Sequence, residues 1–435
     1  MPIIRPGHVV ALAVLALLML GIVMVNSALM EIERTITIGS ILLSRSTIYM
    51  LLSILALSLA ATLPILGLIP GVRKVQLSLP NTQPAIFGNW IKNFGPRHEP
   101  RFGGWAIPWL WIAAGALAAL MLIVYIPGIG RSVNGSHRWI NLQLPGIGDL
   151  SAQPSEIGKW ALIALMAWYA VRVKDRLPHF FTGLLPGLAA AGLVCLTIVI
   201  EDLGTAVLLG AVSAIILIAG GARLWQFLLM LPAAAAAFAA AVMANPYRLE
   251  RIKSFLDPYQ DPEGKGYHMI QSMLAVSGGQ IHGRGLGHGL QKFGYLPEDQ
   301  TDFLFAIICE ELGVFGAAIV VFLYAALIWA ALSIIRKQSN PVLKLVAVGI
   351  TATVGLQALI NMAVVTGLGP TKGIALPLLS SGGTGWILTA ACLGLLINMD
   401  LRGHRYTPTL QPQPTNNHPP QTLTPEQNLH APLPA

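Results

Sequence analysis

Charged residues are scarce in this chain. Only 11% of its 435 residues are Asp, Glu, Lys or Arg, whereas 54% are hydrophobic, and this balance excludes a soluble globular protein. Cysteine is scarcer still, because Cys195, Cys309 and Cys392 are the only three and each lies inside an apolar run. This placement argues against a disulfide framework and against a thiolate metal site.

Long apolar runs dominate the sequence instead. About ten of them have the roughly 17–25 residues that a helix needs to cross about 30 Å of hydrocarbon. We therefore expect an all-α, polytopic integral membrane protein with about ten transmembrane helices. The expected spans are residues 9–29, 49–69, 107–125, 157–171, 181–200, 203–219, 224–244, 303–335, 346–366 and 377–399.

Basic residues in the connections predict the orientation. With the N-terminus in the cytoplasm, most loop Lys and Arg residues are cytoplasmic, and so is the C-terminus. The exception is a large extracytoplasmic loop before the eighth span, residues 245–301, whose six basic residues call for an anionic partner. Residues 1–400 then form one transmembrane domain with a cytoplasmic insertion at 72–105. Residues 401–435 form a Pro-rich cytoplasmic tail expected to be disordered.

Asp302, in the stretch "QTDFLFAI", has two readings. If a helix begins at Thr301 or Asp302, the carboxylate lies in its first turn and stabilises the helix dipole by roughly 0.3–1 kcal/mol. Alternatively, Asp302 is a general base whose pKa is raised by the membrane surroundings and by the neighbouring charges of Glu298 and Asp299. The dipole accounts for one acid but not for three, which slightly favours the functional reading.

Two further carboxylates, Glu310 and Glu311, lie deeper in the eighth span. At about 100° per residue they point about 80° and about 180° away from Asp302 around a helix, so they cannot both face one centre. Carboxylates this deep must pair inside the bundle. We expect them to form a structural polar network.

A second polar cluster, "QPSEIGKW", opens the fourth span. Pro154 suits the first helical position, and Glu156 lies three residues before Lys159, close enough to pair. The pair could serve only to let a lysine sit at the membrane interface, or it could form a charged floor under a substrate. The spacing does not decide between these two readings.

The remaining basic candidates lie in loops. Arg138, in "NGSHRWI", could bind a phosphate or a sugar, or simply accompany an interfacial Trp. Arg248 and Arg251 lie one turn apart in an amphipathic segment for which attraction to anionic lipid is also sufficient. The stretch "GGQIHGRGLGHG" could offer N–H groups to a phosphate, but it lacks GxGxxG spacing and predicts a nucleotide site only very weakly.

Six motifs together resemble the SEDS family (shape, elongation, division and sporulation), typified by RodA and FtsW. They are "NGSHRWI", "QPSEIGK", "EDLGTA", "FLDPYQDPEGKGYHMIQSMLAVSGG", "GLGHGLQKFGYLPEDQTDFLFAIICEELG" and "GPTKGIALPLLSSGG". The resemblance covers roughly residues 9–399 and is closer to FtsW than to RodA. Departures occur at Glu201, where the family has Pro, and at "SSGGTG", where it has "SYGGSS".

The resemblance implies a peptidoglycan glycosyltransferase in the bacterial cytoplasmic (inner) membrane that polymerises lipid II on the outer face. By motif, Asp302 would be the general base of an inverting reaction. Glu156, Lys159 and Arg138 would line its cavity, and we add Arg248, Arg251 and Glu298 as substrate-binding candidates.

The implied partners are lipid II, a class B penicillin-binding protein, and membrane proteins of the divisome or elongasome, with no nucleic acid. No His/acid cluster specifies a metal, although Mg²⁺ or Mn²⁺ could help to stabilise the leaving diphosphate. The alternatives from other classes are a lipid II flippase or transporter, and a non-catalytic scaffold for the penicillin-binding protein.

Overall fold

The computed structural model describes residues 5–29, 44–64, 106–126, 130–133, 136–144, 148–298, 300–371, 373–381 and 383–402. The predicted insertion at 72–105 and nearly all of the predicted tail at 401–435 lie outside these residues. Asp299 and Lys372 lie outside them as well.

Helices build almost all of the described chain, and the all-α polytopic prediction is confirmed. Nine of the described helices are long and apolar enough to cross a membrane, and α6 supplies the span predicted at residues 157–171. The ten helices are α1 (Pro6–Ala28), α3 (Arg45–Thr62), α5 (Ala106–Leu122), α6 (Pro154–Arg172), α7 (Leu185–Val199), α8 (Leu203–Gly220), α9 (Leu224–Met243), α12 (Leu304–Lys337), α13 (Pro341–Val365) and α14 (Thr384–Arg402).

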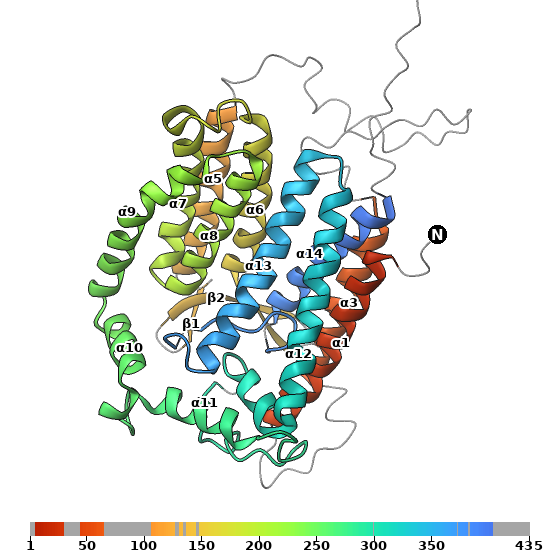
Figure 1. Ribbon diagram of the computed structural model, residues 1–435, viewed down its shortest axis with the longest axis vertical. Coiled ribbons are helices and arrows are strands. Elements are labelled where there is room, and N and C mark those ends of the chain that lie inside the picture. Colours follow the sequence, from red (N-terminus) through yellow and green to blue (C-terminus); the bar gives the residue numbers. More distant parts are fainter. Residues whose placement is uncertain are drawn as a thin grey trace, which may run out of the picture.

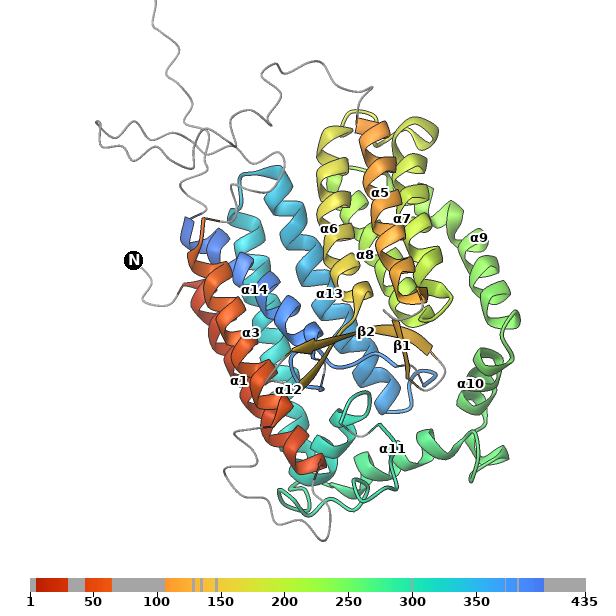
Figure 2. The same ribbon diagram turned by 180° about the vertical axis from the view of Figure 1, so that it is seen from behind.

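Most of these helices form two groups joined by α13 (Figures 1 and 2). In one group α1 packs along α12 and α3 along α14, and in the other α5, α6, α7 and α8 pack together. Helices α3 and α14 cross closely because residue 394 of α14 is glycine. An added Cβ at Gly394 would lie 2.6 Å from the carbonyl oxygen of Leu57 on α3. Small residues at such crossings let transmembrane helices approach each other closely.

Helix α9 stands apart from both groups (Figure 1). Gln226 and Val242 are its only buried residues, and its exposed side chains are apolar, among them many alanines and the larger Leu228 and Leu229. The Gln226 amide donates to the carbonyl of Pro178 at 2.9 Å and ties the start of α9 to the connection between α6 and α7. The apolar faces of α9 suit contact with lipid tails.

One end of the bundle carries the irregular structure, and we call it the sheet end. Here an antiparallel sheet of β1 (Gly130–Val133), β2 (Ser136–Leu144) and β3 (Gly148–Ala152) connects α5 to α6. The short helices η4 (Pro258–Gln260), α10 (Pro246–Leu256) and α11 (Tyr267–Gly278) lie at the same end (Figures 1 and 2). The amphipathic α10 was predicted from the sequence but the sheet was not, because short pairings between neighbouring loop segments leave no apolar periodicity.

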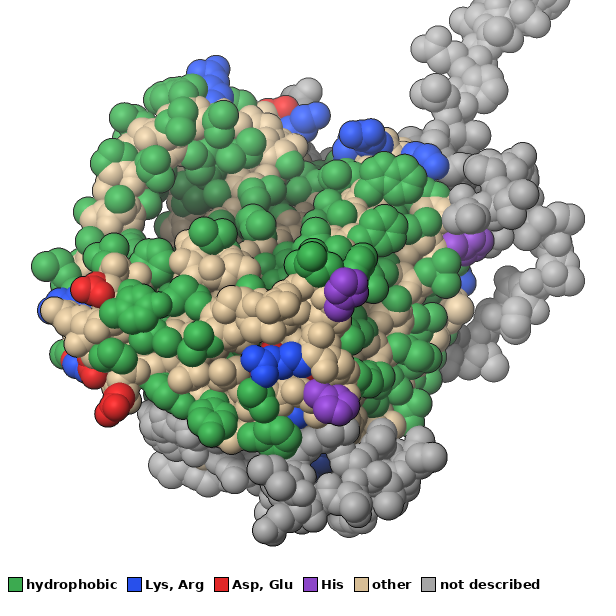
Figure 3. Space-filling model, turned by 60° about the horizontal axis from the view of Figure 1, so that its bottom comes forward, with side chains coloured by type: hydrophobic (Ala, Val, Ile, Leu, Met, Phe, Trp, Pro, Cys, Tyr) green, Lys and Arg blue, Asp and Glu red, His purple; other side chains and the backbone are tan. Residues whose placement is uncertain are grey.

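Viewed from the sheet end, hydrophobic side chains cover much of the described surface, and most of the visible acidic side chains lie toward one edge (Figure 3). The two described termini lie at the opposite end. There the backbone N–H of Gly7 donates to the carboxylate of Asp400 at 3.0 Å, which joins the start of α1 to the end of α14.

Candidate active site

Asp302 lies in a turn that precedes α12. The helix begins at Leu304 with Phe303 at its N-cap, and its first turn contains no acidic residue. The prediction that the helix begins at Thr301 or Asp302 is therefore wrong. Thr301 does not cap the helix because its hydroxyl bonds backwards, to the carbonyl of Glu298 at 3.3 Å and to the Glu298 carboxylate at 2.8 Å. A role in the first turn of the helix no longer accounts for Asp302.

The backbone around Asp302 is fixed by α13 and by the segment that follows it. The buried amide of Asn361 donates to the carbonyl of Asp302 and to that of Ile374, both at 2.7 Å. The N–H of Ser381 donates to the carbonyl of Gln300 at 2.9 Å. An added Cβ at Gly373 would lie 3.2 Å from Oδ2 of Asp302, so glycine allows this segment to approach the carboxylate closely.

Glu156 and Lys159 form the predicted ion pair at the start of α6. Their charged atoms lie 2.7 Å apart, and Lys159 is only 2% exposed. The Lys159 ammonium also lies 5.1 Å from the centroid of the Trp160 ring. A cation this deeply buried requires its carboxylate partner.

One segment, residues 366–385, connects this ion pair to Asp302. Gly373 lies against Asp302, as described above, and the start of α14 lies against α6. Thr384 accepts a hydrogen bond from the N–H of Gln153 at 3.4 Å, and an added Cβ at Gly385 would lie 3.5 Å from a Glu156 carboxylate oxygen. Two clusters that are far apart in the sequence therefore share one end of the bundle.

The two arginines of α10 have different partners. Arg251 donates to the carbonyl of Thr371 at 3.2 Å and to the hydroxyl of Tyr247 at 2.5 Å. Thr371 is two residues from Gly373, so the Arg251 guanidinium reaches the segment that touches Asp302. Arg248 donates instead to the carbonyls of Val199, Ile200 and Ala241, and thereby caps the end of α7. Its role toward a substrate stays a prediction.

Two other candidates stay predictions as well. Arg138 lies on β2, but its side chain is outside the described residues. Glu298 is exposed and has a positive φ of 57°, and its carboxylate accepts the Thr301 hydroxyl.

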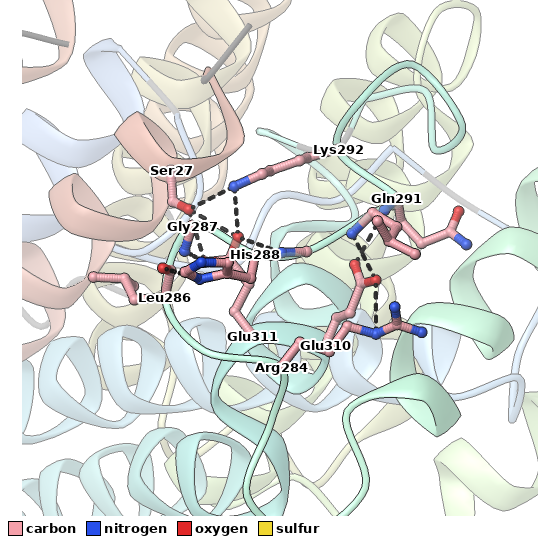
Figure 4. A network of polar contacts seen from close by, with 11 residues as sticks. Ser27, Arg284, Leu286, Gly287, His288, Gln291, Lys292, Glu310 and Glu311 are labelled. Carbon is pink, nitrogen blue, oxygen red and sulfur yellow. Dashed lines mark hydrogen bonds and ion pairs between the residues drawn. The ribbon is translucent and has the colours of Figure 1, made fainter. Parts of the chain in front are cut away.

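Glu310 and Glu311 form the predicted polar network, and the glycine-rich loop wraps around them (Figure 4). The buried carboxylate of Glu311 accepts the hydroxyl of Ser27 on α1 at 2.7 Å and the ammonium of Lys292 at 2.8 Å. The N–H groups of Gly287 and Gly289 also donate to it, at 3.0 and 3.3 Å. This carboxylate is fully surrounded by donors.

Glu310 is held in the same way by the next part of the loop. The N–H groups of Leu290 and Gln291 donate to its carboxylate at 2.8 and 3.2 Å, and Arg284 lies 3.5 Å away. Successive N–H groups of this kind form concavities that suit anions. The backbone N–H groups of this loop, which were considered as phosphate ligands, therefore bind two carboxylates of the same chain.

The loop also interrupts α12 at Gly313. This residue has φ 63° and ψ −157°, and the next N–H, of Val314, donates to the carbonyl of Gln280 instead of continuing the helix. An added Cβ at Gly313 would lie 2.4 Å from the nitrogen of Gly283. Only glycine fits this conformation and this contact together.

His268 is a further candidate that the sequence does not indicate, because a single histidine in α11 belongs to no recognisable pattern. Its ring is stacked on that of Phe303, with centroids 6.2 Å apart and planes 25° apart. Burial, and secondly the charge of Arg251, lower the pKa of His268, while the charge of Glu298 partly opposes this. The imidazole therefore lies beside the turn that carries Asp302.

No group of three or more His, Cys, Asp or Glu residues among the described residues could hold a metal ion. A divalent cation at the site stays a prediction from the chemistry of a diphosphate.

Comparison with known proteins assigns the family. Residues 106–404 match the model of the FtsW, RodA and SpoVE family, described as cell cycle proteins. The chain belongs to this family. It is 37% identical to a probable peptidoglycan glycosyltransferase FtsW of Thioalkalivibrio sulfidiphilus over 91% of this chain and 88% of the relative. It is 39% identical to the stage V sporulation protein E of Bacillus subtilis over 66% of this chain and 77% of that protein.

Solved structures of low identity share the fold of this family member. One comes from work on the structural coordination of polymerization and crosslinking by a peptidoglycan synthase complex, with a TM-score of 0.65, 24% identity and coverage of 92% of this chain and 98% of that chain. A mutant of the rod shape determining protein RodA of Thermus thermophilus gives a TM-score of 0.54 at 20% identity, with coverage of 91% and 97%.

Proposed function

We propose that this chain is a peptidoglycan glycosyltransferase that polymerises lipid II into glycan strands, with Asp302 as the general base. The family and the names of its relatives support the activity. The observation that carries the residue assignment is the position of Asp302. It lies outside the helix, its backbone is held by a buried amide, and Arg251 and the Glu156–Lys159 pair lie at the same end of the bundle.

In this reaction Asp302 takes the proton from the 4-hydroxyl of one substrate's N-acetylglucosamine as that oxygen attacks the anomeric carbon of the other's N-acetylmuramic acid. Undecaprenyl diphosphate leaves from the opposite side, and the configuration inverts. Lys159 and Arg251 are the described cations that could stabilise the negative charge on the leaving group. Glu156 holds Lys159 in place through their ion pair.

The sheet end then faces the outside of the bacterial cytoplasmic membrane, and both termini lie in the cytoplasm. The contact between Gly7 and Asp400 supports a common side for the two termini, since it places the start of α1 next to the end of α14. The basic residues of the connections support the same orientation.

The proposed partner is a class B penicillin-binding protein, within the divisome or the elongasome. Support comes from the solved chain with the highest TM-score given above, which belongs to a peptidoglycan synthase complex that polymerises and crosslinks. The FtsW names among the relatives favour a role in cell division.

A lipid II flippase would place its ionisable groups near the membrane midplane. The groups described here gather at the sheet end, and the deeper Glu310 and Glu311 are already bound by the loop. A scaffold without catalysis would keep its function when Asp302 is replaced.

The test is polymerisation of lipid II by the purified chain with its transpeptidase partner. Wild type should form glycan strands and Asp302→Ala should not, whereas Glu250→Gln, at an exposed ion pair with Lys265, should resemble wild type. Glycan synthesis by Asp302→Ala would support the scaffold. Translocation of lipid II across vesicles without polymerisation would support the flippase.

A further inference from the structure

The imidazole of His268 faces the proposed catalytic turn from α11. It stacks on Phe303, the residue that follows Asp302 and forms the N-cap of α12. A stack of this kind fixes the plane of the imidazole relative to the turn. His268 comes from a separate helix and is therefore held beside the turn that carries Asp302 through its contact with Phe303.

Among the described residues, two charged groups act on His268, namely Arg251 of α10 and Glu298 of the turn before α12. Asp299 and Lys372 lie outside the described residues. Arg251 also binds the carbonyl of Thr371, next to the segment that touches Asp302. A ligand anion bound by Arg251 would thus lie close to His268.

The protonation of His268 must respond to such an anion. In the free protein, burial and Arg251 disfavour the imidazolium and lower the pKa of His268, so the ring is neutral near pH 7. A diphosphate beside Arg251 would offset the guanidinium charge and favour the imidazolium. The direction of the change follows from the charges alone.

We propose that His268 takes up a proton when the diphosphate of the lipid-linked donor binds beside Arg251, and so becomes a third cation at the leaving group, after Lys159 and Arg251. This inference rests on the proposed function for the identity of the ligand. His268 is a positioning residue for the diphosphate, and Asp302 remains the base.

The proton and charge balance of the step is simple. The bond from the acceptor oxygen to the anomeric carbon forms, and the bond from that carbon to the diphosphate oxygen breaks. The acceptor hydroxyl proton goes to Asp302, and the diphosphate leaves with one more negative charge. The proton that His268 has taken from solvent balances this charge until the product dissociates, and no electron is transferred to or from the protein.

The direct test measures proton uptake on binding of undecaprenyl diphosphate. Calorimetric titrations of the full-length protein at pH 7.5 in two buffers of different ionisation enthalpy give the number of protons bound. The comparison uses Asp302→Asn as the background, which removes the other titrating carboxylate. We expect His268→Gln to lower the uptake by at least half, whereas His282→Gln, at an exposed ring on Phe315, should leave it unchanged.

Kinetics provide the second readout. The contribution of His268 is present below its raised pKa in the complex and is lost as pH rises through that pKa. Relative to wild type, His268→Gln should therefore lower kcat roughly tenfold near pH 6.5 and much less near pH 9. A uniform loss at every pH would indicate a purely structural residue and would overturn the inference.

The outcomes separate the two proposals. If wild type polymerises lipid II and His268→Gln takes up as many protons as its background, the His268 inference is wrong and the proposed function stands. If wild type binds undecaprenyl diphosphate with His268-dependent proton uptake but never polymerises lipid II, the proposed function fails. In that case the inference that His268 takes up a proton when a diphosphate binds still stands.

Discussion

At the scale of single residues, two carboxylates nine positions apart are held in different ways. Glu311 is surrounded by an ammonium, a hydroxyl and two backbone N–H groups, so its oxygens are occupied by donors of the same chain. Asp302 is held through its backbone carbonyl, so its carboxylate is not needed for this bond. Both side chains are carboxylates, and their neighbours decide the role of each.

The Glu156–Lys159 pair gives the first prediction at this scale. If the pair is only structural, the double change Glu156→Lys with Lys159→Glu should restore most of what either single change loses, as coupled pairs do in a double-mutant cycle. If Lys159 also faces the diphosphate, the swap places a carboxylate where negative charge develops. We expect the swapped protein to fold and remain inactive. Recovery of glycan synthesis at equal expression and thermal stability would assign both residues to structure alone.

His268 gives a prediction about stability against pH. Its pKa is lowered in the folded protein, so the unfolded chain binds more protons below its ordinary pKa of about 6.5. Wild type should therefore lose stability from this group as pH falls below about 6.5, and the loss should be absent above it. Thermal unfolding in detergent should show His268→Gln gaining on wild type between pH 7.5 and pH 5.5. A constant difference in Tm over that range would contradict the lowered pKa.

At the scale of elements, the apolar runs predicted the helices well because each run has the length of a membrane span. Pro154 also predicted the start of α6, since proline suits the first helical position. The start of α12 was missed because Thr301 bonds to Glu298, a choice that depends on a loop conformation with positive φ. The bonds from the glycine-rich loop to Glu310 and Glu311 were not predicted, because these partners follow the loop by about twenty residues.

The break in α12 can be tested with a matched pair of substitutions. Gly313→Ala introduces a Cβ against the backbone of Gly283 at a positive φ, which should destabilise the protein by roughly 1–3 kcal/mol. Gly210→Ala lies in α8, where an added Cβ meets nothing within 4 Å, and should be neutral or slightly stabilising. Thermal unfolding should separate the two variants. Equal stability would contradict the observed contact between Gly313 and the loop.

At the scale of the whole molecule, the site is assembled from segments that the sequence keeps far apart. Residues 366–385 touch Asp302 at one point and Glu156 at another, and Arg251 reaches the same segment from α10. The motifs predicted which residues carry the chemistry, whereas only the packed bundle shows how they are joined. Asn361 illustrates the limit, because an amide within an apolar helix gives no sign in the sequence of the two carbonyls it binds.

The orientation of the whole chain is the next prediction. A cysteine placed at the exposed Glu263, at the sheet end, should react with an impermeant thiol reagent in intact spheroplasts. A cysteine at the exposed Ser339, between α12 and α13, should react only after the membrane is opened. The reverse pattern would place Asp302 on the cytoplasmic side, where the proposed polymerisation could not occur.

The central claim is that Asp302 removes the proton of the attacking hydroxyl, and a rate measurement tests it most directly. Lipid II polymerisation by the purified protein with its transpeptidase partner should be compared for wild type and Asp302→Asn at equal folded concentration. The amide keeps the volume and leaves the bond from Asn361 to the backbone intact, but it cannot accept the proton. We predict a loss of roughly 10²–10⁴ in rate with unchanged thermal stability, and a smaller loss for Asp299→Asn. A rate for Asp302→Asn close to that of wild type would contradict the account.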